Sequence, residues 1–107
     1  MILYGLKTCD TCRKALGALK AAGREVEFVD VRETPLDAAM RERLLQAFGD
    51  RAVNTRSTTW RGLSEAERAA PADALLAAHP TLMKRPVIDA QGTLHLGWDA
   101  AVRAALL

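Results

Sequence analysis

Two cysteines, Cys9 and Cys12, are separated by two residues near the start of the chain and form a C-x-x-C motif. Two cysteines are too few for a secreted disulfide scaffold, and this spacing is typical of thiol redox work in a reducing compartment. The motif therefore predicts a protein that exchanges electrons with thiols or disulfides.

The segments on either side of the motif indicate how it is held. Residues 2–6 form an apolar run of strand length, and the apolar residues that follow the motif recur at helical spacing, at Ala15, Leu16, Leu19 and Ala22. The cysteines are thus predicted on a strand-to-helix turn, where unpaired amides at the start of the helix favour a thiolate at Cys9. This effect lowers a thiol pKa by at most about 1.5 units. Arg13 and Lys7 would add to it, whereas Asp10 either opposes it or bonds to the first helical turn.

The cysteines have two other interpretations, of which the first stays open and the second is disfavoured. In the first, Cys12 is buried as a small apolar residue, and only the Cys9 sulfur reacts. A structural zinc site needs four ligands, and the remaining candidates, His79 and His95, are far apart in sequence and lack a paired spacing. No metal is therefore expected. The histidines are predicted to be a helix-end cap and an exposed strand residue, respectively.

Composition limits the class of protein. A chain of 107 residues predicts one domain that buries about two thirds of its unfolded surface. The net charge of +2 gives no support to nucleic-acid binding, while 11 arginines against 4 lysines favour discrete contacts with anions. The chain shows neither a leader-like start nor an apolar run of membrane-spanning length, so a cytoplasmic location without membrane contact is expected.

The order of the remaining elements predicts the fold. A second strand over residues 25–31 completes a β-α-β unit with parallel strands, and a helix over residues 36–48 follows, with Pro35 in its first turn. A capping box at Ser64 begins a short helix, and Pro71 opens another over residues 72–78. A hairpin over residues 84–97 and a helix over residues 98–107 close the chain. This order is that of a thioredoxin-like α/β fold with a four-stranded mixed sheet, here a single domain 1–107 with a helical insertion at about 35–80.

Two further segments carry candidate anion-binding residues. The polar, aperiodic residues 53–63 include Arg56, Trp60 and Arg61, which fit either a solvated loop or an anion pocket. Arg85 precedes Pro86, and a cis peptide bond there would bring Arg85 close to the reactive cysteine. Base rate alone favours the trans form, because only about 5–6% of such bonds are cis.

Three separated motifs resemble those of one family. They are YGLKTCDT at residues 4–11, NTRSTTWR at residues 54–61 and KRP at residues 84–86, with LGW at residues 96–98 near the end. In this order they resemble the arsenate reductase (ArsC)-like branch of the thioredoxin-fold proteins, and most closely its YffB-like members.

The resemblance implies roles for single residues. Cys9 would be the nucleophile, Arg56 or Arg61 together with Arg85 would hold an anionic substrate or the carboxylates of glutathione, and the Arg85–Pro86 bond would be cis. Gly97 stands where arsenate reductases carry a further arginine, which counts against arsenate as the substrate. Cys12 is a second departure, because such relatives typically lack it.

Our working hypothesis is a monomeric cytoplasmic thiol–disulfide reductase that uses glutathione as co-substrate and has no bound cofactor. In it Cys9 attacks a disulfide and Cys12 resolves the intermediate. The residues expected to bind the substrate or glutathione are Arg13, Arg56, Arg61, Arg85 and Pro86. The resemblance also gives two alternatives. One is an Spx-like redox-sensing regulator that uses C-x-x-C as a switch and binds the α-subunit of RNA polymerase, and the other is an arsenate reductase.

Overall fold

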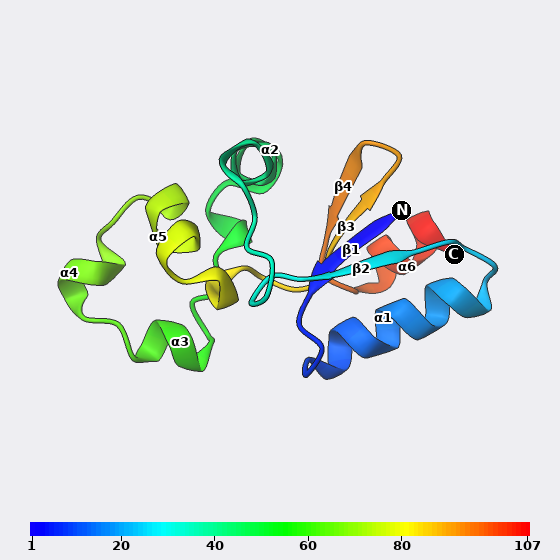
Figure 1. Ribbon diagram of the computed structural model, residues 1–107, viewed down its shortest axis with the longest axis horizontal. Helices are drawn as coiled ribbons and strands as arrows, with labels where there is room; N and C mark the ends of the chain where they lie inside the picture. The colour runs from blue at the N-terminus through cyan, green and yellow to red at the C-terminus, as the bar shows by residue number, and fades with distance from the viewer. The chain divides into compact units, whose positions relative to one another are not determined.

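The contacts within the chain divide it into two compact units. A computed structural model describes all residues from 1 to 107 (Figure 1). The sheet unit comprises Met1–Val31 and Arg85–Leu107, and the helical unit comprises Arg32–Lys84. The chain therefore leaves the sheet unit after its second strand and re-enters it before its third.

The sheet unit holds one four-stranded mixed sheet. Its strands are β1 (Ile2–Gly5), β2 (Glu27–Asp30), β3 (Val87–Ala90) and β4 (Thr93–Leu96), in the spatial order β2-β1-β3-β4. Strand β1 pairs parallel with β2 and antiparallel with β3, and β4 is antiparallel to β3. The predicted fold class, a thioredoxin-like fold with a mixed sheet, is confirmed.

Two helices pack on one face of this sheet (Figure 1). Helix α1 (Asp10–Ala21) and helix α6 (Ala100–Leu106) share an apolar cluster with Leu3 and Ile88, which are directly opposite each other on β1 and β3. The helices contribute Cys12, Ala15, Leu19, Val102 and Leu106 to it. Burial of each large aliphatic side chain is worth about 1.5–3 kcal/mol, so this cluster fixes α1 against β1.

The hairpin between β3 and β4 follows its sequence signal. Gln91 and Gly92 both have positive φ angles, 54° and 90°, as a two-residue type I′ turn requires. The Gly92 amide also donates a hydrogen bond of 2.8 Å to Asp89 Oδ1. The predicted hairpin is therefore confirmed.

The helical unit consists of short helices. They are α2 (Ala38–Phe48), η1 (Gly49–Ala52), α3 (Thr58–Arg61), α4 (Glu65–Arg68), α5 (Ala72–Ala78) and η2 (Pro80–Leu82). Arg41 Nε donates to Asp73 Oδ1 at 2.8 Å and so joins α2 to α5. None of the chain's helices has the length and apolar character needed to cross a bilayer.

Two predicted helix starts are wrong by two residues because an aspartate caps each helix later. Asp37 Oδ1 accepts from the Met40 amide at 2.8 Å, so α2 begins at Ala38 and Pro35 lies outside its first turn. In the same way Asp99 Oδ1 accepts from the Val102 amide at 3.0 Å. Since a short acceptor side chain at the N-cap satisfies an amide of the first turn, the aspartates decide these boundaries.

The polar segment 53–63 is not wholly a loop, contrary to its aperiodic sequence. Ser57 Oγ accepts from the Trp60 amide at 3.1 Å and begins the single-turn helix α3. The capping box predicted at Ser64 is confirmed, with Ser64 and Glu67 each bonding to the other's amide. Hydroxyl caps thus start two consecutive short helices that have little apolar periodicity.

Candidate functional site

The turn between β1 and α1 holds Cys9 in a defined backbone conformation. The Cys9 amide donates to the Leu6 carbonyl at 3.1 Å, and the Cys9 carbonyl accepts from the Arg13 amide at 3.0 Å. Across the turn, the Lys7 amide donates to Asp30 Oδ2 at 3.0 Å, which ties the turn to the end of β2. Cys9 is therefore the N-cap residue of α1, and the predicted strand-to-helix turn at the cysteines is confirmed.

The surroundings of the Cys9 sulfur favour its ionised form. Partial burial is the largest single influence and would raise the pKa of the thiol, but the amide and thiol of Cys12 and the guanidinium of Arg85 together outweigh it and lower the pKa. The Cys9 side chain makes no capping hydrogen bond of regular geometry. The Cys12 amide thus acts mainly through its partial positive charge at the start of the helix. A half-exposed sulfur with a lowered pKa has the properties of a reactive cysteine.

Cys12 lies in the opposite environment. Its side chain is fully buried in the cluster between α1 and the sheet. Burial, and the hydrogen bond and negative charge of Cys9, raise the pKa of the Cys12 thiol to about 12, although the Leu6 amide and Arg85 act against this rise. The two sulfurs of the motif therefore differ sharply in access and in acidity.

Gly5 makes room for the buried sulfur. A Cβ atom added at Gly5 would lie 2.4 Å from Cys12 Sγ, a distance that real Cβ atoms do not show. The sequence analysis did not single out Gly5, because a glycine at the end of a strand gives no signal of what it touches. Its position directly before the C-x-x-C turn is the one available hint.

Arg85 and Pro86 lie in the sheet unit together with the two cysteines. The Arg85–Pro86 bond is cis, as the resemblance implied and contrary to base rate. Pro86 is fully buried, and its carbonyl accepts from the Gly97 amide at 2.8 Å. Of the predicted site residues, Cys9, Cys12 and Arg85 lie together, since Arg85 acts on the pKa of both thiols.

Arg13 has a partner of its own. Its Nη2 forms an ion pair of 2.5 Å with Asp10 Oδ1, one turn earlier on α1, and both side chains are largely exposed. The carboxylate of Asp10 therefore bonds to the Arg13 side chain. Arg13 is not among the groups that lower the pKa of Cys9.

Arg56 and Arg61 belong to the helical unit. Arg56 is exposed, and its amide donates to Asn54 Oδ1 at 3.0 Å. Arg61 ends α3, where its carbonyl accepts from Arg68 Nη2 at 3.3 Å. Arg68 Cζ also lies 5.4 Å from the centre of the Trp60 ring, so the two side chains form a cation–π contact.

A family model gives the decisive comparison. The model of the ArsC family matches residues 4–105, which is almost the whole chain. The chain belongs to the ArsC family. The resemblance stated from the sequence motifs is thus confirmed.

Relatives of this ArsC-family chain agree with that assignment. An uncharacterised protein of Haemophilus influenzae is 39% identical over 102 residues, which cover 91% of this chain and 90% of the relative. Among solved structures, the YFFB protein is 32% identical with a TM-score of 0.89, covering 99% of this chain and 97% of its own. An arsenate reductase (ArsC) related protein from Brucella melitensis is 34% identical with a TM-score of 0.74, covering 97% and 91%, respectively.

The ArsC-family chain has cationic residues near Arg56 that the sequence analysis missed. A cavity of about 670 Å³ in the helical unit is lined by Arg56 together with Arg51 and Lys84, and the other lining residues are Asp50, Val53, Asn54 and Thr55. Lys84 was identified only within the KRP motif, and Arg51 was not identified as a site residue. Spacing gives no signal for either, since the isolated bridge between Val53 and Met83 brings the two segments together.

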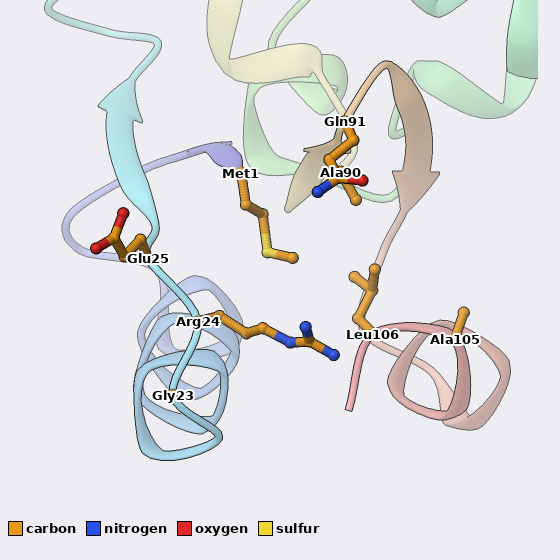
Figure 2. A pocket seen from close by; sticks show the side chains of 8 residues that line it. All are labelled: Met1, Gly23, Arg24, Glu25, Ala90, Gln91, Ala105 and Leu106. Atoms are coloured by element: carbon orange, nitrogen blue, oxygen red, sulfur yellow. The ribbon is translucent and has the colours of Figure 1, made fainter.

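A second cavity, in the sheet unit, holds none of the predicted site residues. Figure 2 shows this cavity, of about 460 Å³, with its charged side chains on Arg24 and Glu25. Its remaining lining residues are Met1, Gly23, Ala90, Gln91, Ala105 and Leu106. Gly23 follows the C-terminal end of α1, whereas Cys9 precedes the other end, so this cavity is separate from the cysteine site.

The two histidines of this family member lie at the end of α5 and on β4. His79 is the C-cap residue of α5, as predicted, with its Nε2 3.8 Å from Glu67 Oε2. His95 is on β4 opposite Ile88, and it is half-buried rather than exposed as predicted, because it pairs with a fully buried strand residue. No group of three or more His, Cys, Asp or Glu side chains is arranged to hold a metal.

Proposed function

We propose that this protein is a glutathione-linked thiol–disulfide reductase in which Cys9 is the nucleophile. The observation that carries the proposal is the environment of the Cys9 sulfur. It is half-exposed at the start of α1, and the Cys12 donors and Arg85 outweigh partial burial and lower its pKa. A sulfur that is both accessible and ionised can attack a disulfide.

The reaction on a mixed disulfide of glutathione has two exchanges. The Cys9 thiolate attacks the glutathione sulfur, forms a disulfide with it, and releases the substrate as a thiolate that takes a proton from water. A second thiolate then attacks the glutathione sulfur and releases Cys9 as a thiolate. When that second thiolate is glutathione, the substrate is reduced and oxidised glutathione is the other product. If Cys12 is the second thiolate, as the C-x-x-C spacing predicts, it attacks the Cys9 sulfur instead, releases glutathione as a thiolate and leaves a Cys9–Cys12 disulfide that external glutathione has to reduce.

Arginines supply the binding sites for anions in this proposal. Arg85, beside the Cys9 sulfur, suits a carboxylate or another anionic group next to the reacting disulfide. Arg56, with Arg51 and Lys84 on the same cavity, suits the carboxylates of glutathione. Arg61 and Pro86 complete the proposed contacts, and Arg13 would exchange Asp10 for a ligand carboxylate.

The backbone conformation of Gly97 counts against arsenate as the substrate. Gly97 has a φ angle of 82°, in the left-handed region that favours glycine. An arginine at this position, as the resemblance implies for arsenate reductases, would be strained in the present conformation. We therefore propose disulfide rather than arsenate chemistry, and we place it in the cytoplasm, where glutathione keeps thiols reduced.

A coupled assay tests the proposal. The purified protein is given the mixed disulfide of cysteine and glutathione, reduced glutathione, and glutathione reductase with NADPH to report the oxidised product. We expect turnover in the wild type and in Lys14→Gln, an exposed charge change on α1, and none in Cys9→Ser. Turnover that survives in Cys9→Ser would contradict the assignment of the nucleophile.

The regulator alternative has its own outcome. A redox switch predicts negligible turnover in the coupled assay and a Cys9–Cys12 disulfide that changes binding to a partner. Purified RNA polymerase, mixed with the oxidised and the reduced protein, reports this directly. Binding only by the oxidised form, without turnover, would replace the enzyme proposal with the regulator.

A further inference from the structure

The second cysteine of the motif is placed where a disulfide substrate cannot reach it. Cys12 has 0% of its side-chain area exposed, whereas Cys9 three residues earlier is half-exposed. An attacking thiolate has to approach a disulfide sulfur directly. Cys12 is therefore closed to substrate while Cys9 is open to it.

The buried sulfur is held in place from several sides. Gly5 on β1 lies so close that a Cβ there would come within 2.4 Å of Cys12 Sγ and 3.2 Å of Cys12 Cβ. Leu3, Ala15 and Ile88, all fully buried, belong to the same cluster. In a close-packed interior a side chain of this kind keeps one position, because movement would open a void or cause a clash.

This fixed position faces Cys9. Cys9 is the N-cap residue and Cys12 is the third residue of α1, the pair of positions at which an N-cap side chain meets a backbone amide. Cys9 packs against the apolar cluster that contains Cys12, and the amide and the thiol of Cys12 both lower the pKa of the Cys9 thiol.

We infer that Cys12 is a positioning residue that donates its S–H hydrogen bond to the Cys9 thiolate, and that an external thiol rather than Cys12 resolves the Cys9 mixed disulfide. The inference rests on the proposed function only in taking Cys9 as the nucleophile. In this chain the second cysteine of the C-x-x-C motif thus serves to activate the sulfur of the first.

The chemistry of the cycle is consistent with this role. Because burial and Cys9 raise the pKa of the Cys12 thiol to about 12, Cys12 is protonated at pH 7. The Cys12 proton stays on its sulfur throughout. The hydrogen bond from Cys12 is lost when the Cys9 sulfur forms its disulfide with glutathione. It forms again when a second glutathione thiolate attacks that disulfide, which releases oxidised glutathione and the Cys9 thiolate. The bond therefore stabilises Cys9 both as nucleophile and as leaving group.

Titration of Cys9 tests the hydrogen bond. The rate of alkylation by iodoacetamide is measured against pH in wild type, Cys12→Ala and Cys12→Ser. We expect Cys12→Ala to raise the pKa of Cys9 and to slow alkylation at pH 7 by a factor of about 5–10, and Cys12→Ser, which keeps a donor, to stay within about twofold of wild type. No change in either variant, or an equal change in both, would overturn the inference.

A trapping experiment on the wild type tests the resolving step without relying on a variant that has to fold. Reduced protein is mixed with oxidised glutathione, quenched with acid and weighed by mass spectrometry. We expect one added glutathione, located on Cys9 by peptide mapping, which persists until reduced glutathione is supplied. Conversion of this adduct to a Cys9–Cys12 disulfide would show that Cys12 resolves, and would overturn the inference.

These measurements separate the inference from the proposed function. Alkylation and adduct formation need no turnover of a physiological substrate, so an inactive coupled assay leaves both readouts informative. An active enzyme that forms the internal disulfide would keep the proposed function and remove the inference.

Discussion

Gly5 and Cys12 are in such close contact that any side chain at residue 5 would occupy the space of the Cys12 sulfur, since a Cβ there would be 2.4 Å from Sγ. The pair joins β1 to α1 next to the turn that holds Cys9. The position of the buried sulfur, and through it the donor that faces Cys9, therefore depends on a residue with no side chain.

The first prediction follows from this contact. Gly5→Ala should lower the free energy of unfolding by about 1–3 kcal/mol, because overpacking forces the sulfur or the backbone to move. Gly17→Ala is the matched control: nothing lies within 4 Å of its added Cβ, and alanine in a helix is favoured over glycine by about 0.5–1 kcal/mol. Urea unfolding of both variants measures the difference.

A double variant checks that the cost comes from the sulfur. Cys12→Ala removes Sγ and leaves the approaches of 3.2 Å to Cys12 Cβ and 3.3 Å to Leu3 Cδ2, so the destabilisation by Gly5→Ala should be smaller in that background than in wild type. Additive effects of the two substitutions would mean that the contact is not the cause.

The second prediction concerns the charge beside Cys9. Arg85→Gln should raise the pKa of Cys9, because the guanidinium lowers it both as a donor and as a charge. Below its pKa a thiol loses thiolate tenfold for each unit of increase, so alkylation at pH 7 should slow by about 3–10-fold. Lys14→Gln removes an exposed positive charge from α1 and serves as the control. Equal alkylation rates in Arg85→Gln and wild type would exclude Arg85 from activation.

The third prediction is a loss of stability in alkali that depends on Cys12. Its folded pKa of about 12 exceeds the value of about 8.5 in an unfolded chain, so the stabilisation is complete below pH 8.5 and is lost as the pH rises toward 12. Between pH 7 and pH 10 the wild type should lose about 1–2 kcal/mol more than Cys12→Ala. Chemical unfolding at both pH values measures this, and parallel losses in the two proteins would contradict the raised pKa.

The fourth prediction tests a helix boundary. Asp99→Ala should cost about 1 kcal/mol in the free energy of unfolding, because the Val102 amide at the start of α6 loses its acceptor. Asp99→Asn keeps a side-chain acceptor at the cap and should stay close to wild type. Thermal or urea unfolding of both variants distinguishes the loss of the capping hydrogen bond from the loss of the negative charge.

The sequence predicted most of the fold because its signals were local. The turn at Gln91 and Gly92, the Ser64 capping box and the strand-to-helix turn at Cys9 each depend on residues within a few positions of one another. The starts of α2 and α6 were placed two residues early because apolar periodicity was given more weight than the capping aspartates.

The sequence predicted the residue types of the candidate site and left open whether Cys12 is buried, which the structure shows it is. Cys9 and Arg85 were found from a motif and a resemblance, whereas the full burial of Cys12 depends on β1, β3 and α1 closing over it. Nothing in the spacing of two cysteines reports how deeply the second is packed. Arg51 was missed for a similar reason, since the cavity it shares with Lys84 depends on a contact between segments far apart in the chain.

The chain leaves the sheet unit after β2 and returns to it before β3, so the two units are separate stretches of sequence. The groups that set the acidity of the Cys9 thiol, Cys12 and Arg85, lie within Met1–Val31 and Arg85–Leu107. Substitutions confined to Arg32–Lys84 therefore leave each of these groups in the chain, and the helical unit is open to mutagenesis that removes none of them.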